Sequence, residues 1–329
     1  MPVIDVDCHF DVVLGAEEHP LREWADRLPT LEQFITDANS GDLGRSTPEQ
    51  SRPDEAILAM FLPDENRSSA EQAICPGKFP ARFPVATPEE RIGWFDGVGI
   101  DYALMNPGSL GFLADYMGND LPEAVRRCND FMADRLAGST GRMLQVSLID
   151  WHDLNGAVAE LQRMHARGSR AFWVRAEPYN GVSPAHPDWD RVWSAATDLG
   201  MVAILHVGNT PARFEGGWGN VGWESPGGAG LGVAGPWPFE TTPGEMVRHN
   251  VRATPLMGLG DVNVADGLLQ QLPEMLIFSS DYPHGEGNAD PIALYEPALS
   301  SLDEGLRASF LGANKAECFA RTGDPLPDR

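Results

Sequence analysis

Four residues whose side chains can bind a divalent metal stand at the ends of apolar segments in this chain. They are Asp7, His9, His206 and Asp281. Each follows a short apolar run typical of a buried strand, and in a parallel α/β protein the carboxyl ends of such strands carry the chemistry. Two imidazoles and two carboxylates form a ligand set that suits Zn²⁺ or Mn²⁺. The sequence therefore predicts one metal site built from three distant segments.

The spacing of the first pair strengthens this prediction. Asp7 and His9 are two residues apart, so on a strand their side chains point to the same side. Cys8, between them, should point the opposite way into packing, and we expect no nucleophilic role for it. An alternative stays open, in which Asp7 and His9 are terminal capping groups and Asp281 caps a helix before Pro283.

Strands and helices alternate from Thr87 onwards. Thr87-Pro88-Glu89-Glu90 has the form of a capping box that starts a helix. We expect strands at 3–9, 102–105, 143–149, 171–174 and 201–206, with helices at 120–136, 153–167 and 188–199. Such alternation is typical of parallel strands joined by right-handed crossovers.

This alternation breaks between residues 209 and 240, which are rich in Gly, Trp and Pro. It resumes at the capping box Thr242-Pro243-Gly244-Glu245, with strands expected at 251–256 and from Ile277. Further helices are expected near 264–272, 291–300 and 302–311, and the last two should finish the chain. The count is seven strands, whereas a closed (β/α)₈ barrel needs eight.

Composition narrows the function classes. The formal charge of −24, from 48 acids against 24 bases, argues against a nucleic-acid-binding surface. No apolar run approaches the roughly 18 residues of a membrane span. The four cysteines lie far apart without a CxxC pair, and no signal peptide precedes the first strand. We expect a cytoplasmic protein that binds a small-molecule substrate.

The metal-binding pattern also resembles a known family. Asp7-x-His9, Leu205-His206 and Ser280-Asp281-Tyr282-Pro283-His284-x-Glu286-Gly287 are similar to motifs of the amidohydrolase superfamily. The resemblance is strongest to its amidohydrolase-related branch, which includes aminocarboxymuconate-semialdehyde decarboxylase. It extends over nearly the whole chain, residues 1–329, as a single barrel domain with a long insertion or lid at about 11–86.

The resemblance implies a fold, a site and an activity. The fold would be an α/β (β/α)₈ TIM-type barrel, with its sixth strand missing or degenerate here. Asp7, His9, His206 and Asp281 would bind one divalent metal, with Zn²⁺ expected first and Mn²⁺ as the alternative. The activity would be nonoxidative decarboxylation, or hydrolysis, of a small carboxylated cyclic or aromatic substrate. The rival interpretation is a non-catalytic barrel that binds the metal or has lost it.

Two departures from the family pattern bear on the chemistry. Many members have histidine where this chain has Asp7, although acid ligands at that position do occur in the decarboxylase branch. The family also expects a strand, and usually a catalytic histidine, where residues 209–240 show neither. At the fourth strand Arg175 stands in place of a bridging lysine, which favours one metal over two.

Three further residues or groups are candidates for the reaction. Arg175 could hold a substrate carboxylate with two hydrogen bonds, or it could pair with Glu177. His284 could act as an acid or base together with Asp281, or it could pack in its loop. Trp218, Trp223 and Trp237 could wall an apolar pocket. His152 and His186 are expected to be peripheral.

The missing strand leaves three interpretations. Residues 209–240 could close the wall irregularly, a neighbouring subunit in a homodimer could fill it, or residues could be absent between about 209 and 245. We favour the last interpretation. It predicts two consecutive residues near 230–240 whose Cα atoms lie much farther apart than about 3.8 Å.

Overall fold

The computed structural model describes residues 1–9, 18–29, 87–175, 179, 182–206, 240–255, 262–282 and 290–326. The predicted insertion at 11–86 lies mostly outside these residues. The Gly-rich segment also lies outside them up to residue 239, so the prediction about Cα spacing near 230–240 falls outside as well. The expected extent of a single domain stays a prediction.

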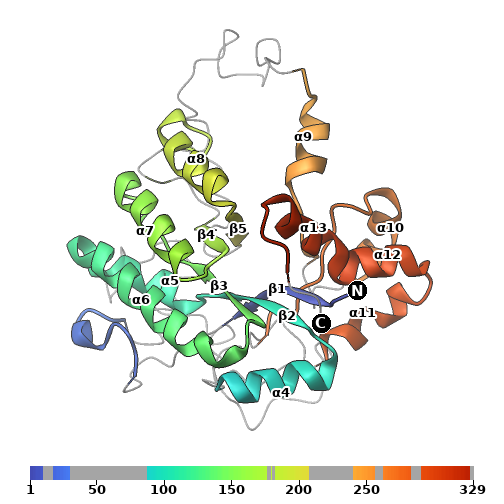
Figure 1. The fold of residues 1–329 in the computed structure, drawn as a ribbon, viewed down its shortest axis with the longest axis horizontal. Helices are drawn as coiled ribbons and strands as arrows, with labels where there is room; N and C mark the ends of the chain where they lie inside the picture. The colour runs from blue at the N-terminus through green and yellow to red at the C-terminus, as the bar shows by residue number, and fades with distance from the viewer. Residues whose placement is uncertain are drawn as a thin grey trace, which may run out of the picture.

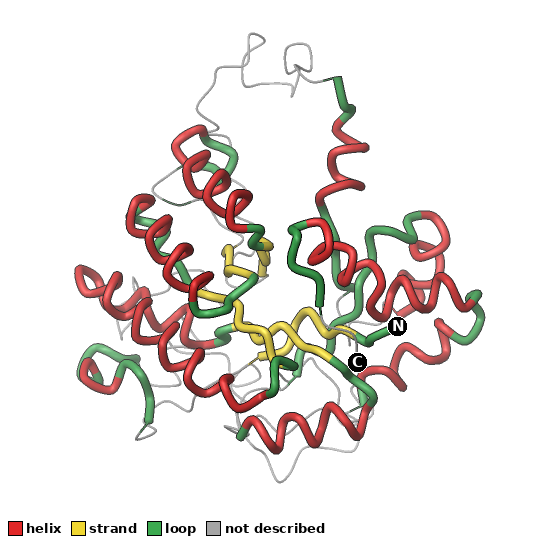
Figure 2. Tube along the Cα trace, viewed as in Figure 1, coloured by secondary structure: helices red, strands yellow, loops and turns green. Residues whose placement is uncertain are grey.

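A curled parallel sheet forms the centre of the molecule (Figure 2). Its five strands follow the order of the chain, and each pairs in parallel with the next. They are β1 (Ile4–His9), β2 (Tyr102–Asn106), β3 (Met143–Ser147), β4 (Ala171–Arg175) and β5 (Val202–His206). This order and direction confirm the parallel arrangement expected from the sequence.

The wall continues on the free side of β1. The backbone N–H of Val6 donates to the carbonyl of Phe278 at 3.2 Å, and that of His9 donates to the carbonyl of Tyr282 at 2.7 Å. Beyond this segment, Ala253 and Leu276 form a parallel bridge. The regions expected as strands at 251–256 and from Ile277 are therefore extended neighbours of β1, although neither forms a full strand.

The other end of the wall is open within the described part of the chain. There β5 pairs with β4 alone, and its residues alternate between half-buried and exposed, with Leu205 64% exposed. Seven parallel segments thus form a partial barrel. The part of the prediction that describes a parallel α/β wall is confirmed, whereas a closed eight-stranded barrel is not seen in the described residues.

Helices cover the outer side of the sheet (Figure 1). The helices that follow β1 to β4 are α4 (Pro88–Val98), α5 (Ser109–Leu113), α6 (Leu121–Leu136), α7 (Leu154–Ala166) and α8 (Asp190–Leu199). Those that follow β5 are α9 (Pro243–Asn250), α10 (Val262–Gln271), α11 (Pro291–Leu299), α12 (Glu304–Ala308) and α13 (Asn314–Arg321). Figure 1 shows α5 to α8 on one side and α9 to α13 on the other, with α4 below β2.

Local sequence explains where several helices begin. The side chains of Thr87 and Thr242 each accept a hydrogen bond from the backbone N–H three residues on. The side chains of Glu90 and Glu245 accept from the backbone N–H of these threonines, so both predicted capping boxes are confirmed. Asp120, by contrast, makes no capping hydrogen bond at the start of α6. The reason is that a 3₁₀ helix (Ala114–Asp120) runs directly into α6, so the chain is already helical at Asp120.

The two ends of the chain contain short helical turns. Within residues 18–29 the structure has one 3₁₀ turn, Arg22–Trp24. At the other end of the chain α12 does not finish the fold, since a π-helical turn (Ser309–Ala313) leads into α13. Gly312 in that turn lies against the first strand: a Cβ there would come within 1.8 Å of the Pro2 carbonyl oxygen. This close approach requires glycine and fixes the C-terminal helices against β1.

Two apolar cores hold the described elements together. The larger core lies around β1, β2 and the segment 276–282, and it includes Phe95, Phe278 and Phe310, all fully buried. The smaller core lies between β4 and helices α7 and α8, and includes Phe172, Trp189 and Val192. No helix among the described residues is long and apolar enough to span a membrane.

Candidate metal centre

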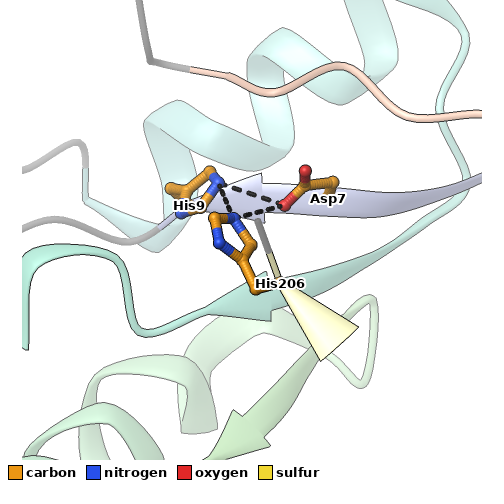
Figure 3. A group of neighbouring side chains, drawn as sticks. All are labelled: Asp7, His9 and His206. Carbon is orange, nitrogen blue, oxygen red and sulfur yellow. Dashed lines mark hydrogen bonds and ion pairs between the residues drawn. The ribbon is translucent and has the colours of Figure 1, made fainter. Parts of the chain in front are cut away.

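Asp7, His9 and His206 meet at the carboxyl ends of β1 and β5 (Figure 3). Asp7 Oδ1 lies 3.1 Å from His9 Nε2 and 3.5 Å from His206 Nε2. The two Nε2 atoms are 3.3 Å apart. All three atoms lie within 4.8 Å of one another, which is close enough for one ion to contact each of them.

Asp281 lies beside this group. Its Oδ1 is 3.3 Å from His9 Nε2, and its backbone N–H donates to the Asp7 carbonyl at 2.7 Å. It does not belong to the set of atoms that are all mutually within 4.8 Å. The structure thus brings three of the four predicted ligands together and places the fourth next to them.

The charges in the centre favour an ionised Asp7. Burial by itself opposes ionisation, but the charges and hydrogen bonds of His9 and His206 outweigh it, so the pKa of Asp7 is held well below its usual value. Asn106, at the end of β2, donates from Nδ2 to Asp7 Oδ1 at 2.7 Å. A carboxylate with a fixed orientation facing two imidazole nitrogens is a donor set that fits Zn²⁺ or Mn²⁺.

Asp5, two residues before Asp7 on β1, is hydrogen-bonded to Ser280 and so helps to hold the residues of the centre in place. It is fully buried, and its carboxylate accepts from the backbone N–H of Ser280 at 2.9 Å and from the Ser280 hydroxyl at 2.5 Å. Burial raises its pKa to about 7, although these hydrogen bonds oppose that rise. Because Ser280 precedes Asp281, this link joins β1 to the segment that carries the fourth ligand.

Cys8 points away from the centre, as predicted from the strand alternation. Its sulfur accepts a hydrogen bond from Arg91 Nη1 at 3.1 Å, and the Arg91 guanidinium lies 4.2 Å from the centre of the Tyr282 ring. Burial raises the pKa of the Cys8 thiol far above its ordinary value. A buried, protonated thiol is a poor nucleophile, so Cys8 serves packing.

Trp173 connects the metal centre to a small apolar pocket. Its ring lies 6.0 Å from that of His206, and it also lines a pocket with Trp151, Tyr179 and His152. The pocket has room for about one water molecule. It lies beyond the carboxyl ends of β3 and β4, on the same side of the sheet as the candidate ligands.

The remaining predicted residues have different outcomes. Arg175 ends β4, where it pairs with His206 in the strand register, but its side chain lies outside the description. His284 and the three tryptophans of 209–240 also lie outside the described residues. His186 accepts from the backbone N–H of Asp188 and starts a 3₁₀ turn, so it serves a local capping role.

Sequence reasoning missed Asn106, Asp5 and Trp173. Asn106 ends a strand, as the predicted ligands do, and that position was the available signal. Asp5 shares the alternation of Asp7 and His9, which could have placed it on the same face. Nothing in the local sequence distinguishes Trp173 from other strand residues.

The similarity of this chain to known proteins is found in its structure. No protein-family model matches this chain, and no curated protein does. Solved structures do match. An amidohydrolase from Mycobacterium avium subsp. paratuberculosis K-10 is 17% identical, covers 97% of this chain and 99% of its own, and has a TM-score of 0.59.

Two decarboxylases match this chain with similar sequence identities, coverages and TM-scores. The 5-carboxyvanillate decarboxylase of Sphingomonas paucimobilis is 17% identical, covers 97% of this chain and 99% of its own, and has a TM-score of 0.58. A dihydroxybenzoic acid decarboxylase from Polaromonas sp. JS666, solved with manganese and the inhibitor 2-nitroresorcinol, is 15% identical over 97% of each chain, with a TM-score of 0.57. This chain shares their fold. The amidohydrolase-type fold agrees with the family resemblance seen in the sequence motifs.

Proposed function

We propose that this protein is a metal-dependent enzyme of the amidohydrolase superfamily, and specifically a decarboxylase of a small aromatic or cyclic carboxylic acid. The observation that carries the proposal is the meeting of Asp7, His9 and His206 within 4.8 Å. Two similar structures are decarboxylases, one of 5-carboxyvanillate and one of dihydroxybenzoic acid, and this supports the choice of reaction. Hydrolysis of a cyclic or aromatic substrate is the alternative.

One group of residues would bind the metal, and other residues would bind the substrate. Asp7, His9 and His206 would hold one divalent ion, and Asp281 would complete the set from its place 3.3 Å from His9. Such an ion would supply a Lewis acid that polarises the substrate. Manganese fits the two carboxylates and occurs in a similar structure, whereas zinc fits the two imidazoles.

The chemical step is a replacement of CO₂ by a proton. The bond between the ring carbon and the carboxyl carbon breaks, CO₂ leaves, and the electron pair stays on the ring carbon until an acid protonates it. We propose His284 for that acid because it follows Asp281 closely in the chain. Arg175, whose backbone pairs with His206, would bind the substrate carboxylate. Trp173, whose ring lies 6.0 Å from that of His206, would contact an aromatic substrate ring.

Metal analysis and product assays together test this proposal. The protein as purified, and after addition of Mn²⁺ or Zn²⁺, is incubated with ortho-hydroxybenzoic acids, and CO₂ release is measured. Lactones and amides are assayed in parallel for acid production. We expect about one ion per chain and CO₂ release that depends on it. Hydrolysis without CO₂ release would select the alternative reaction, and a protein that binds no metal would contradict the proposal.

A further inference from the structure

A group of positive charges lies at the opposite end of the strands from the metal centre. Arg170 directly precedes β4, and Arg252 directly precedes Ala253, which bridges to Leu276. Five residues of β4 separate Arg170 from the carboxyl end of that strand, a distance of about 16 Å. Lys315, on α13, is the third member. We call Arg170, Arg252 and Lys315 the basic cluster.

Contacts with one aromatic ring bring two of these cations together. Lys315 Nζ lies 5.0 Å from the centre of the Phe319 ring, and the Arg170 guanidinium carbon lies 4.5 Å from the same point. The two groups are therefore at most 9.5 Å apart. Arg252 approaches α13 through Glu317, to which its Nη2 donates at 3.2 Å. The charges of Arg252 and Arg170 both act on Lys315 and lower its pKa, so we treat the three cations as one cluster.

Lys315 has no anionic partner among the described residues, although it is only 3% exposed. Its pKa is lowered to about 8, first by burial and then by the charges of Arg252 and Arg170. Removing a cation from water without a counter-charge costs free energy. The stability of the fold therefore does not explain why a lysine is buried here.

The neighbouring carboxylates leave part of the charge uncompensated. Arg170 Nε lies 2.7 Å from Asp324, while its Nη2 is buried without a hydrogen-bond acceptor in the described structure. Glu317 is shared between Arg252 and Arg321, whose Nε lies 3.6 Å from Glu317 Oε1. The Nε of Arg252 is also buried without a hydrogen-bond acceptor in the described structure. Two carboxylates thus face four cations, in a chain whose net charge is −24.

We infer that the basic cluster binds a small oxyanion, a phosphate group, between Lys315, Arg170 and Arg252. A phosphate group accepts several hydrogen bonds at once, and arginine forks and a lysine ammonium are its usual donors. It would supply acceptors for the unpaired N–H groups and the negative charge that Lys315 lacks. The source can be free phosphate or a phosphorylated metabolite. This inference does not depend on the proposed decarboxylase activity.

Binding can be measured through stability, because a ligand that binds only the folded state raises the free energy of unfolding. Urea unfolding of the full chain is followed with increasing inorganic phosphate, against chloride at equal ionic strength. Lys315→Met keeps the length of the side chain and removes its charge. Arg307→Gln is the matched control, because Arg307 pairs with Glu296 on the surface of α12 and α11. His206→Asn excludes phosphate binding at the metal centre as the cause.

We expect phosphate to raise the urea midpoint equally in the wild type, Arg307→Gln and His206→Asn. In Lys315→Met the apparent affinity should fall by about tenfold or more, since a hydrogen bond to a charged group is lost. Arg170→Gln should also weaken phosphate binding. This variant is used for the test if Lys315→Met does not fold. Glycerol 3-phosphate, titrated in the same way, distinguishes a phosphorylated metabolite from free phosphate by binding more tightly. An equal phosphate response in Lys315→Met, or no response in the wild type beyond that to chloride, would overturn the inference.

Discussion

Around β1 the sheet has hydrogen-bonded neighbours on both sides, whereas β5, within the described residues, has β4 alone. We call the first region the closed side and the second the open side. The closed side contributes Asp7, His9 and Asp281, and buries Phe278 completely. The open side contributes His206, next to an exposed Leu205. The residues of the candidate metal centre are thus mostly positioned by the closed side, and His206 on the open side completes the group.

This difference has a physical cause. On the closed side the backbone N–H groups of His9 and Asp281 cross between adjacent segments, so the ligand positions follow from the hydrogen bonds of the sheet. On the open side the position of His206 depends on the pairing of β5 with β4. Two predictions test whether the two sides differ in stability as much as in structure, and a third tests how the larger core responds to acid.

The largest expected effect is on stability at the closed side. Phe278→Ala removes a fully buried ring that packs edge-on against Tyr295 and Phe310, and should lower the free energy of unfolding by about 3–5 kcal/mol. Leu205→Ala, on the open side, should change it by less than about 0.5 kcal/mol because Leu205 is 64% exposed. Urea denaturation measures both. Equal losses would show that the two sides are packed alike.

The second effect is on metal affinity. His9→Ala and His206→Ala should each lower the affinity by more than about 100-fold, since losing a direct ligand costs more than losing its supporting hydrogen bond. Their effects on the metal-free fold should differ. His9 is 1% exposed, so its loss should cost about 1–3 kcal/mol. The His206 side chain is 14% exposed, so His206→Ala should cost less than His9→Ala. Competition with a chelator and urea unfolding give the two values. Full metal content in His206→Ala would mean that the ligand is wrong.

The third effect concerns pH. His19 is 1% exposed. Its Nδ1 accepts a hydrogen bond from the backbone N–H of Leu21 at 3.2 Å, and Leu21 packs in the larger core. Burial lowers the pKa of His19 to about 4. The unfolded chain takes up a proton below about pH 6.5 and the folded chain does not, so stability falls as the pH drops from 6.5 to 4.

That loss should reach up to about 2 kcal/mol, allowing for partial screening by solvent. His19→Gln should flatten this part of the pH profile, while His249→Gln, on the exposed face of α9, should leave it unchanged. Chemical denaturation at several pH values measures the slope. An unaltered slope in His19→Gln would assign the acid sensitivity to other groups.

The sequence predicted those parts of the site that depend on strand ends. Asp7, His9 and His206 each end an apolar run, and the parallel sheet brings these ends together, so spacing along the chain carried the information. Asn106 was missed because an amide at a strand end looks like an ordinary turn residue. Its role depends on the pairing of β1 with β2, which is a long-range fact.

The fold was predictable to a similar extent. Alternation of strand and helix gave the order and direction of β1 to β5, because each crossover is a local pattern. The helix α13 was not predicted, since its packing depends on long-range contacts such as that between Phe319 and the guanidinium of Arg170. The segments 251–256 and 277–282 were expected as strands, but they make only isolated bridges at the side where the wall ends.

The backbone of Asp281 restricts which residues evolution or design can place there. Its φ is 53°, a left-handed conformation that aspartate and asparagine tolerate and that costs most other side chains about 1–2 kcal/mol. Glutamate keeps the charge but would incur that cost, and asparagine keeps the backbone but loses the charge. Variation at this position is therefore constrained twice, by chain geometry and by ligand chemistry, and aspartate meets both constraints at once. A library randomised at position 281 and selected for metal binding should return mainly the residue already present.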